Sequence, residues 1–390
     1  MWIGGTPTIK IKNSKPNNNK FLPFPLNNNV WFFYSARYAL YYALKALELG
    51  AGDGILAPSY CCGTEIDPIL ALGCEIKWYP VKDKLIPDIN FIKEQWNHNI
   101  KGILVTHYLG FNCLKDDLSE FCRENNILII EDCAHAFLSN TETGQPLGST
   151  GDASVFSIRK TLPIPDGGCL FLRETKHWPL NFSLQPPGIS SILFRILELF
   201  SETSTPRNGY AMKLSTAMLR YFGKGGELIR IFFRLIRKLF GGFENLFIDP
   251  NSYVFSDMAR KWRISDYSRN MLNYFDWNRI KKTRRSNYIF LLEQIGSIQR
   301  VRVLFDNLPD GVCPLFFPII VDNRMKLHNF LKKRGIDSHL WWGYFHPSVP
   351  WDSFPRSVEL KNKLLGLPIH QDLGKWHMDK IIGALKEALS

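Results

Sequence analysis

The 390 residues are enough for two domains with a sizeable core, and a mix of 45% hydrophobic and 22% charged residues argues against a disordered chain. The formal net charge of +12 raises the question of an anionic partner, whether nucleic acid, anionic substrate or membrane surface. The eight cysteines form no CxxC pair, which argues against zinc-ribbon and thioredoxin-like motifs.

The N-terminus lacks the basic-then-apolar pattern of a signal peptide, and no apolar run approaches the ~20 residues of a membrane span. We therefore expect a cytoplasmic protein with reduced cysteines. An N-terminal arm occupies residues 1–29, with an Asn/Lys/Pro-rich stretch at residues 12–29, and precedes the first predicted domain.

Residues 30–175 alternate between short apolar runs and helical patterns. Strands are predicted at residues 55–58, 75–81, 102–106, 127–130, 153–158 and 169–172, and helices at 36–49 and 114–125. This alternation predicts an α/β domain with a mostly parallel sheet, whose ligand crevice lies beyond the carboxyl ends of the strands.

The alternation of strand and helix patterns ends after residue 175. Residues 176–260 form a basic, amphipathic insertion that completes a large domain spanning residues 30–260. Residues 261–390 predict a smaller α+β domain with a strand at 315–321 and helices at 268–295, 324–334 and 375–389.

The first candidate for a binding segment is SARYA, which opens a helix directly after the apolar run at residues 30–34. A helix N-terminus presents backbone N–H groups and a partial positive charge that suit a phosphate at Ala36 and Arg37. An ordinary helix cap at Ser35, with Arg37 in solvent, is the simpler reading of this segment alone.

The second candidate is IEDCAHA, where Asp132 follows an apolar strand. A carboxylate at the crevice edge needs a cationic partner, and the protonated ring nitrogen of pyridoxal phosphate (PLP) is one. His135 is placed to touch the ring or its phenolic oxygen. A Cys/His/Asp metal cluster is the rival, but no second set of ligands has suitable spacing, so no metal is expected.

The third candidate is Lys160, which leaves a predicted strand and enters a Pro- and Gly-rich turn. Amine attack on an aldehyde needs a neutral lysine, so partial burial and nearby cations such as Arg159 would help. Ser157 is a candidate phosphate ligand. A surface lysine in a loop is the alternative.

Taken together, these segments resemble the DegT/DnrJ/EryC1/StrS family of sugar aminotransferases, which have the PLP-dependent transferase (aspartate aminotransferase-like) fold. The family's lysine motif is matched by KTLPIPDGG, its aspartate motif by EDCAHA, and its later signatures by WRISD, RGIDSHLWWGYFHPSVP and LGLPIHQDL. The resemblance spans about residues 29–176 and 262–389.

The resemblance implies a homodimeric, PLP-dependent aminotransferase. It implies that Lys160 carries the cofactor as a Schiff base and moves the proton, while Asp132 faces the ring nitrogen. His135 would contact the ring, and Ser157, Ala36 and Arg37 the phosphate. The implied substrates are an amino-acid donor, usually glutamate, and a keto-sugar nucleotide used in polysaccharide or glycan biosynthesis.

Three positions depart from the family pattern. Ser157 stands three residues before Lys160, two fewer than usual, and Arg37 replaces a common Thr. Cys62 occupies a position where the family often has an aromatic that stacks on the ring, with Tyr60 as the nearest substitute. These departures leave open other PLP chemistry, such as sugar dehydration or a lipid-linked substrate, and a non-catalytic binding or regulatory relative. Related dehydratases have histidine in place of the lysine, so Lys160 argues against that subclass.

Residues 191–241 hold nine Lys/Arg against three Asp/Glu, with an amphipathic pattern at 227–240. This pattern suits a helix lying on the anionic inner face of a membrane, and equally a helix packed on a partner subunit, which we favour. No recognised module supports nucleic-acid binding.

Overall fold

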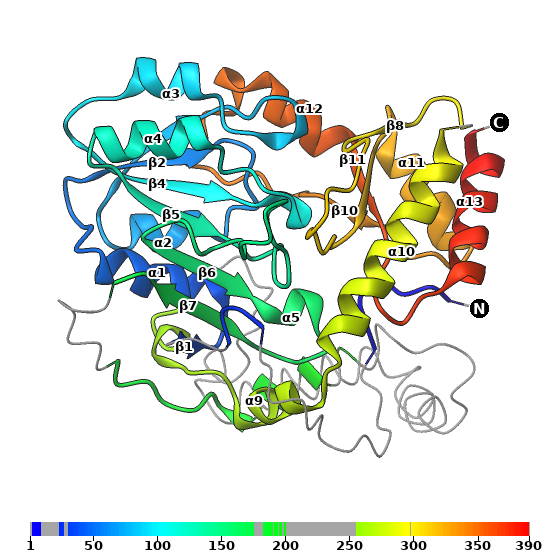
Figure 1. The fold of residues 1–390 in the computed structure, drawn as a ribbon, viewed down its shortest axis with the longest axis horizontal. Helices are drawn as coiled ribbons and strands as arrows, with labels where there is room; N and C mark the ends of the chain where they lie inside the picture. The colour runs from blue at the N-terminus through cyan, green and yellow to red at the C-terminus, as the bar shows by residue number, and fades with distance from the viewer. Residues whose placement is uncertain are drawn as a thin grey trace, which may run out of the picture.

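The computed structural model describes residues 2–8, 23–26, 30–174, 182–189, 191–193, 195–196, 199, 255–296 and 298–389. Within these residues the chain forms a seven-stranded sheet and a separate four-stranded sheet, each with helices packed beside it (Figure 1). The helix expected at 227–240 lies outside the described residues, as does most of the basic segment 191–241.

Alternating strands and helices from residue 30 to residue 172 build the large sheet. Its strands are β1 (Val30–Phe33), β2 (Gly54–Pro58), β3 (Glu75–Tyr79), β4 (Ile100–Thr106), β5 (Leu128–Asp132), β6 (Ala153–Ser157) and β7 (Gly168–Leu172). The helices between them are α1 (Ala36–Ala46), α2 (Ile66–Leu70), α3 (Ile89–Gln95), α4 (Asp116–Glu124) and α5 (Ile158–Thr161). Each predicted strand of this region is present, with ends shifted by at most two residues.

The strand order is β1-β7-β6-β5-β4-β2-β3. Neighbours from β3 to β6 pair in parallel, whereas β7 pairs antiparallel with both β6 and β1. The predicted mostly parallel sheet is therefore confirmed. Because β5 and β6 run in parallel, their carboxyl ends bring Asp132 and Ser157 to the same edge of the sheet.

Helices cover both faces of this sheet, with α1 and α2 on one side and α3 and α4 on the other (Figure 1). Strands β2, β4 and β6 are buried almost throughout, as expected for near-continuous apolar runs that are covered on both faces. Buried side chains of α3 and α4 belong to one apolar cluster, and most of those of α1 belong to another together with Ile69 of α2.

The C-terminal part holds the smaller sheet, in the order β10-β11-β9-β8. Its elements are β8 (Arg302–Val303), β9 (Phe317–Ile320), α11 (Arg324–Lys333), β10 (His339–Leu340), α12 (Pro355–Lys363), β11 (Leu364–Leu367) and α13 (Lys375–Leu389). Helix α13 and the predicted strand around β9 lie where they were expected.

The single helix expected at residues 268–295 is wrong. The chain forms α9 (Asp266–Met271), a 3-10 turn at Leu272–Tyr274 and then α10 (Trp277–Ile295). Phe275 is extended and the Asp276 carboxylate accepts a hydrogen bond from the Arg279 amide, which caps a new helix. The apolar period continues across this break, which is why the pattern concealed it.

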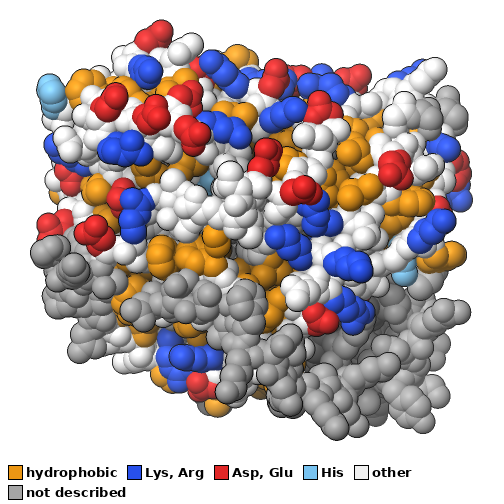
Figure 2. All heavy atoms as spheres, viewed as in Figure 1, with side chains coloured by type: hydrophobic (Ala, Val, Ile, Leu, Met, Phe, Trp, Pro, Cys, Tyr) orange, Lys and Arg blue, Asp and Glu red, His pale blue; other side chains and the backbone are white. Residues whose placement is uncertain are grey.

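Residues 2–8 lie beside the C-terminal helices (Figure 1), whereas Phe24 packs on Phe156 and Phe171 of the large sheet. Ile3 bridges to Ile336, and both the amide and the hydroxyl of Thr8 donate to the Asp372 carboxylate, at 2.7 and 2.9 Å. On the face shown in Figure 2, acidic and basic side chains are interspersed. Among the described helices, none is both long and apolar enough to cross a membrane.

Candidate active site

A cavity of about 420 Å³ lies at the carboxyl ends of β5 and β6 and the N-terminus of α1. It brings together six of the residues predicted from sequence: Ala36, Arg37, Asp132, His135, Ser157 and Lys160. Tyr60 lies outside the lining that the described residues form. Its ring packs on Trp342, with ring centroids 5.1 Å apart, so Trp342 rather than Tyr60 faces the cavity.

Lys160 projects into this cavity from the short helix α5, directly after β6. Its amine nitrogen lies 3.0 Å from Nε2 of His135. Burial lowers the pKa of Lys160, although Cys62 and Asp132 act in the opposite direction. Burial therefore shifts Lys160 toward the neutral amine, which is the nucleophilic form.

The imidazole of His135 is buried and neutral. Burial and the nearby Lys160 hold the pKa of His135 well below its usual value. The Leu109 amide donates to Nδ1 at 3.4 Å, which assigns the ring proton to Nε2. Nε2–H then donates to the Lys160 amine, a bond that requires the amine to be neutral.

Asp132 ends strand β5 with its carboxylate turned toward the cavity. The carboxylate accepts a hydrogen bond from the Ala134 amide at 2.9 Å. Burial and the neighbouring Glu65 raise the pKa of Asp132 to about 6, and Lys160 opposes this rise. A cationic partner in the cavity would stabilise the ionised form.

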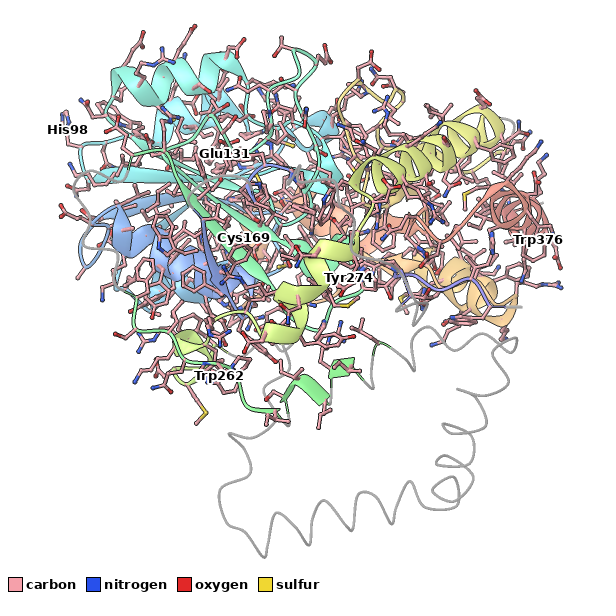
Figure 3. The ribbon with its side chains drawn as sticks, turned by 60° about the horizontal axis from the view of Figure 1, so that its bottom comes forward. His98, Glu131, Cys169, Trp262, Tyr274 and Trp376 are labelled. Atoms are coloured by element: carbon pink, nitrogen blue, oxygen red, sulfur yellow. The ribbon has the colours of Figure 1, made fainter. Side chains whose placement is uncertain are left out.

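Behind Asp132, the buried Glu131 fixes the end of the same strand. Figure 3 shows Glu131 inside the molecule, in contrast to Trp376 at its outer edge. Burial would raise the pKa of Glu131, but a 2.7 Å hydrogen bond from His107 and bonds from loop amides lower it overall. His107, Glu131 and Cys133 could together hold a metal, but these bonds already occupy the carboxylate. We assign this cluster a structural role.

The opposite end of the cavity is formed by the N-terminus of α1. Ser35 occupies the cap position, yet its hydroxyl makes no cap bond and is buried with no hydrogen-bond partner among the residues that the structure describes. Gly168 of β7 lies against the Ser35–Ala36 peptide so closely that a Cβ there would overlap it. The helix end, the Ser35 hydroxyl and Ser157 therefore form a cradle suited to a phosphate.

Several residues of the cavity were missed by sequence reasoning. The Glu65 carboxylate accepts from the Cys62 amide at 3.0 Å and from the Cys62 thiol at 2.8 Å. Burial and Glu65 raise the pKa of Cys62 to about 12, so the thiol stays protonated. Among the other missed residues, some come from the C-terminal part and the N-terminal arm: Trp341, Trp342, His339, Thr6 and Pro7. A signal existed for the first three, because they lie within the matched segment RGIDSHLWWGYFHPSVP.

The described residues fit PLP. The Ser35 hydroxyl, which has no partner among the described residues, lies in the cradle at the phosphate end. Asp132 needs a cation where the ring nitrogen would lie, and Lys160 offers an amine of lowered pKa to an aldehyde. These three features occur in one cavity, which is large enough for a small organic cofactor together with part of a substrate.

Comparisons with known proteins identify the family of the chain. Residues 19–217, about half of the chain, match the model of the DegT/DnrJ/EryC1/StrS aminotransferase family. A GDP-perosamine synthase of Vibrio cholerae is 28% identical over 133 residues, covering 33% of this chain and 36% of the relative. A dTDP-4-dehydro-2,3,6-trideoxy-D-glucose 4-aminotransferase of Saccharopolyspora spinosa is 28% identical over 148 residues, covering 37% and 38%.

The match thus spans little more than a third of the length of these curated relatives. Among solved structures, S. venezuelae DesV superposes with a TM-score of 0.64 at 17% identity, covering 92% of this chain and 84% of DesV. That likeness extends the shared fold over nearly the whole chain. The chain belongs to the DegT/DnrJ/EryC1/StrS aminotransferase family.

Proposed function

We propose that this protein is a PLP-dependent aminotransferase that transfers an amino group from an amino acid, with glutamate as the first candidate, to a keto-sugar nucleotide in polysaccharide or glycan biosynthesis. The observation that carries the proposal is the neutral-amine environment of Lys160, in one cavity with Asp132 and the N-terminus of α1. Family membership and the two sugar-nucleotide relatives support the substrate class.

When bound, PLP supplies an aldehyde and a ring that stabilises negative charge at the amino-bearing carbon. Asp132 would hold a proton on the ring nitrogen, since its carboxylate gains a cationic partner there. Ser35, Ala36, Arg37 and Ser157 would hold the phosphate, so that the ring is fixed at both ends.

Lys160 would act first as the covalent anchor and then as the base and acid that moves a proton at the substrate carbon. His135 supports this role because its Nε2–H would donate to the neutral form of the amine. The cavity walls of Trp341 and Trp342 would exclude water from the reacting centre.

The experiment is a two-step spectroscopic assay. Purified protein loaded with PLP should be yellow, and adding L-glutamate without an acceptor should move the visible absorbance toward the pyridoxamine form. Keto-sugars carried on GDP and dTDP should then restore the first spectrum. Lys160→Met is the matched control, expected to bind cofactor weakly and not to respond to glutamate. Cofactor-loaded wild type that never responds to glutamate would contradict glutamate as the donor.

We further propose a homodimer and a large domain that ends near residue 260. The family resemblance supports both, and sedimentation of the full chain tests the first. For residues 191–241 we favour packing of a helix on the partner subunit, and peripheral membrane contact is the alternative, supported by the excess of basic residues there. Flotation with anionic liposomes at low salt tests this contact, and absence of binding would contradict it.

A further inference from the structure

Lys361 of α12 is fully buried although it carries an ionisable amine. Its nitrogen donates to the carbonyl oxygen of Cys61 at 2.8 Å and to that of Tyr344 at 2.7 Å. Burying an ammonium is costly unless its donors are satisfied, so a fully buried lysine needs a specific reason.

Three aromatic rings complete the surroundings of the amine. The nitrogen lies 4.9 Å from the ring centroid of Trp351, 5.1 Å from that of Phe345 and 6.0 Å from that of Trp342. Carbonyl oxygens and ring faces attract a cation, and none of these groups donates a proton to the amine. Burial lowers the pKa of Lys361, while Cys61, Glu65 and Cys62 oppose this shift. Although burial acts against the charged form, the two carbonyl oxygens and three ring faces are arranged to attract an ammonium.

The two carbonyls belong to the two walls of the active cavity. Cys61 precedes Cys62, Thr64 and Glu65, which line the cavity from the large sheet. Tyr344 follows Trp341 and Trp342, which line it from the C-terminal part. Lys361 itself lies behind these walls, outside the lining that the described residues form.

The walls also meet directly beside the amine. Gly63 has a φ of +95°, and a Cβ there would lie 2.9 Å from the ring of Tyr344, so the approach requires glycine. In addition, the Tyr60 hydroxyl donates to the Trp341 carbonyl at 3.4 Å. A change in the separation of these segments would therefore move both cavity walls.

We propose that Lys361 is a positioning residue whose ammonium acts as a covalently attached monovalent cation and binds the Cys61 and Tyr344 carbonyls together. This clamp keeps the cavity walls that carry Cys62 and Trp342 at the separation that holds the cofactor. The contacts of the Lys361 amine with the two carbonyls do not depend on a bound cofactor. Only the effect of the clamp on cofactor binding rests on the proposed function.

The first test needs no cofactor. In apo protein, Lys361→Met should raise hydrogen exchange of the amides at residues 60–65 and 341–346 together, because both segments lose the same anchor. Lys363→Met is the matched control, since Lys363 lies in the same helix and pairs at the surface with Asp322 at 3.1 Å. Its exchange pattern should equal that of wild type. Unchanged exchange in Lys361→Met would overturn the proposal.

The second test separates the cation from general packing. Lys361→Ala should bind PLP at least tenfold more weakly than wild type, and methylammonium should restore binding where tetramethylammonium at equal ionic strength does not. Loss without such rescue would overturn the cation role. Wild type that takes up no PLP would contradict the proposed function instead. The hydrogen-exchange experiment on apo protein would still show whether Lys361 holds the two segments together.

If both Lys361 variants fail to fold, the proposal can be tested by substituting one of the aromatic rings around the amine. Trp351→Leu removes the nearest ring face and should raise exchange in both segments, whereas Trp351→Phe retains a ring and should have the smaller effect. Equal effects of these two variants would overturn the cation–π part of the clamp.

Discussion

The amine nitrogen of Lys160 lies 3.0 Å from Nε2 of His135, and the Leu109 amide occupies the other ring nitrogen. The direction of this hydrogen bond determines which form of the lysine is present. With the ring proton on Nε2, His135 donates and the lysine is neutral.

His135→Leu tests this direction. Removing the donor should raise the pH at which Lys160 reacts with PLP by about 0.5–1 unit, since a hydrogen bond of about 1 kcal/mol to the neutral amine is lost. The rate of PLP uptake from pH 6 to 10, followed by absorbance, gives the midpoint. His377→Leu, which removes an imidazole on α13, is the control. A downward shift would show that a charged lysine donates to His135 instead.

Asp132→Asn should stabilise the apo protein while weakening cofactor binding. Burial and Glu65 raise the pKa of Asp132 in the folded state to about 6, above that of the unfolded chain. Wild type therefore loses stability as the pH rises from about 4 through 6, by on the order of 3 kcal/mol, and the variant lacks this loss. Denaturant unfolding of both apo proteins should coincide near pH 4 and diverge at pH 7.

Asp166→Asn is the contrasting variant for this measurement. Burial also raises the pKa of Asp166 to about 6, but its carboxylate accepts from the Ser265 amide at 2.8 Å and from the Ser265 and Ser268 hydroxyls. An amide cannot accept all of these bonds, so this variant should lose stability at pH 7. If Asp132→Asn were no more stable than wild type at pH 7, the account of Asp132 would be wrong.

Gly168→Ala should damage the phosphate cradle. A Cβ at this position overlaps the Ser35–Ala36 peptide, so the start of α1 must move, at a cost of about 1–3 kcal/mol. The loss of affinity should be larger for PLP than for pyridoxal, which lacks the phosphate. Binding titrations with the two compounds measure this difference.

The control for that experiment is Gly383→Ala in α13. Apart from the neighbouring backbone of its own helix, a Cβ at Gly383 meets no described atom within 4 Å, and the helix interior favours alanine by about 1 kcal/mol. This variant should be slightly more stable and bind PLP normally. Equal losses for PLP and pyridoxal in Gly168→Ala would contradict the phosphate role of the α1 N-terminus.

The large sheet and much of the cavity were predictable because their signals are local. Apolar runs mark the strands, and Asp132, Ser157 and Lys160 follow strand ends that a parallel sheet must bring together. The order of the motifs along the chain and the spacing between them carried the family resemblance. The apolar run of β5, with Asp132 at its end, is the main local signal for the position of the cavity.

The remaining features depend on contacts between distant residues. The pairing of Lys361 with the Cys61 carbonyl joins residues 300 positions apart, and no local pattern predicts it. From the sequence alone, Glu65 looks like an ordinary surface carboxylate. Only the fold shows that it contacts Cys62. The break before Asp276 was hidden because the apolar period continues across it.

The attachment of PLP to Lys160 is the central claim, and borohydride reduction tests it most directly. Protein incubated with PLP, reduced and digested should carry one pyridoxyl label, on the peptide that contains Lys160, and Lys160→Met should carry none. A label on another lysine, or wild type that takes up no label, would contradict the account.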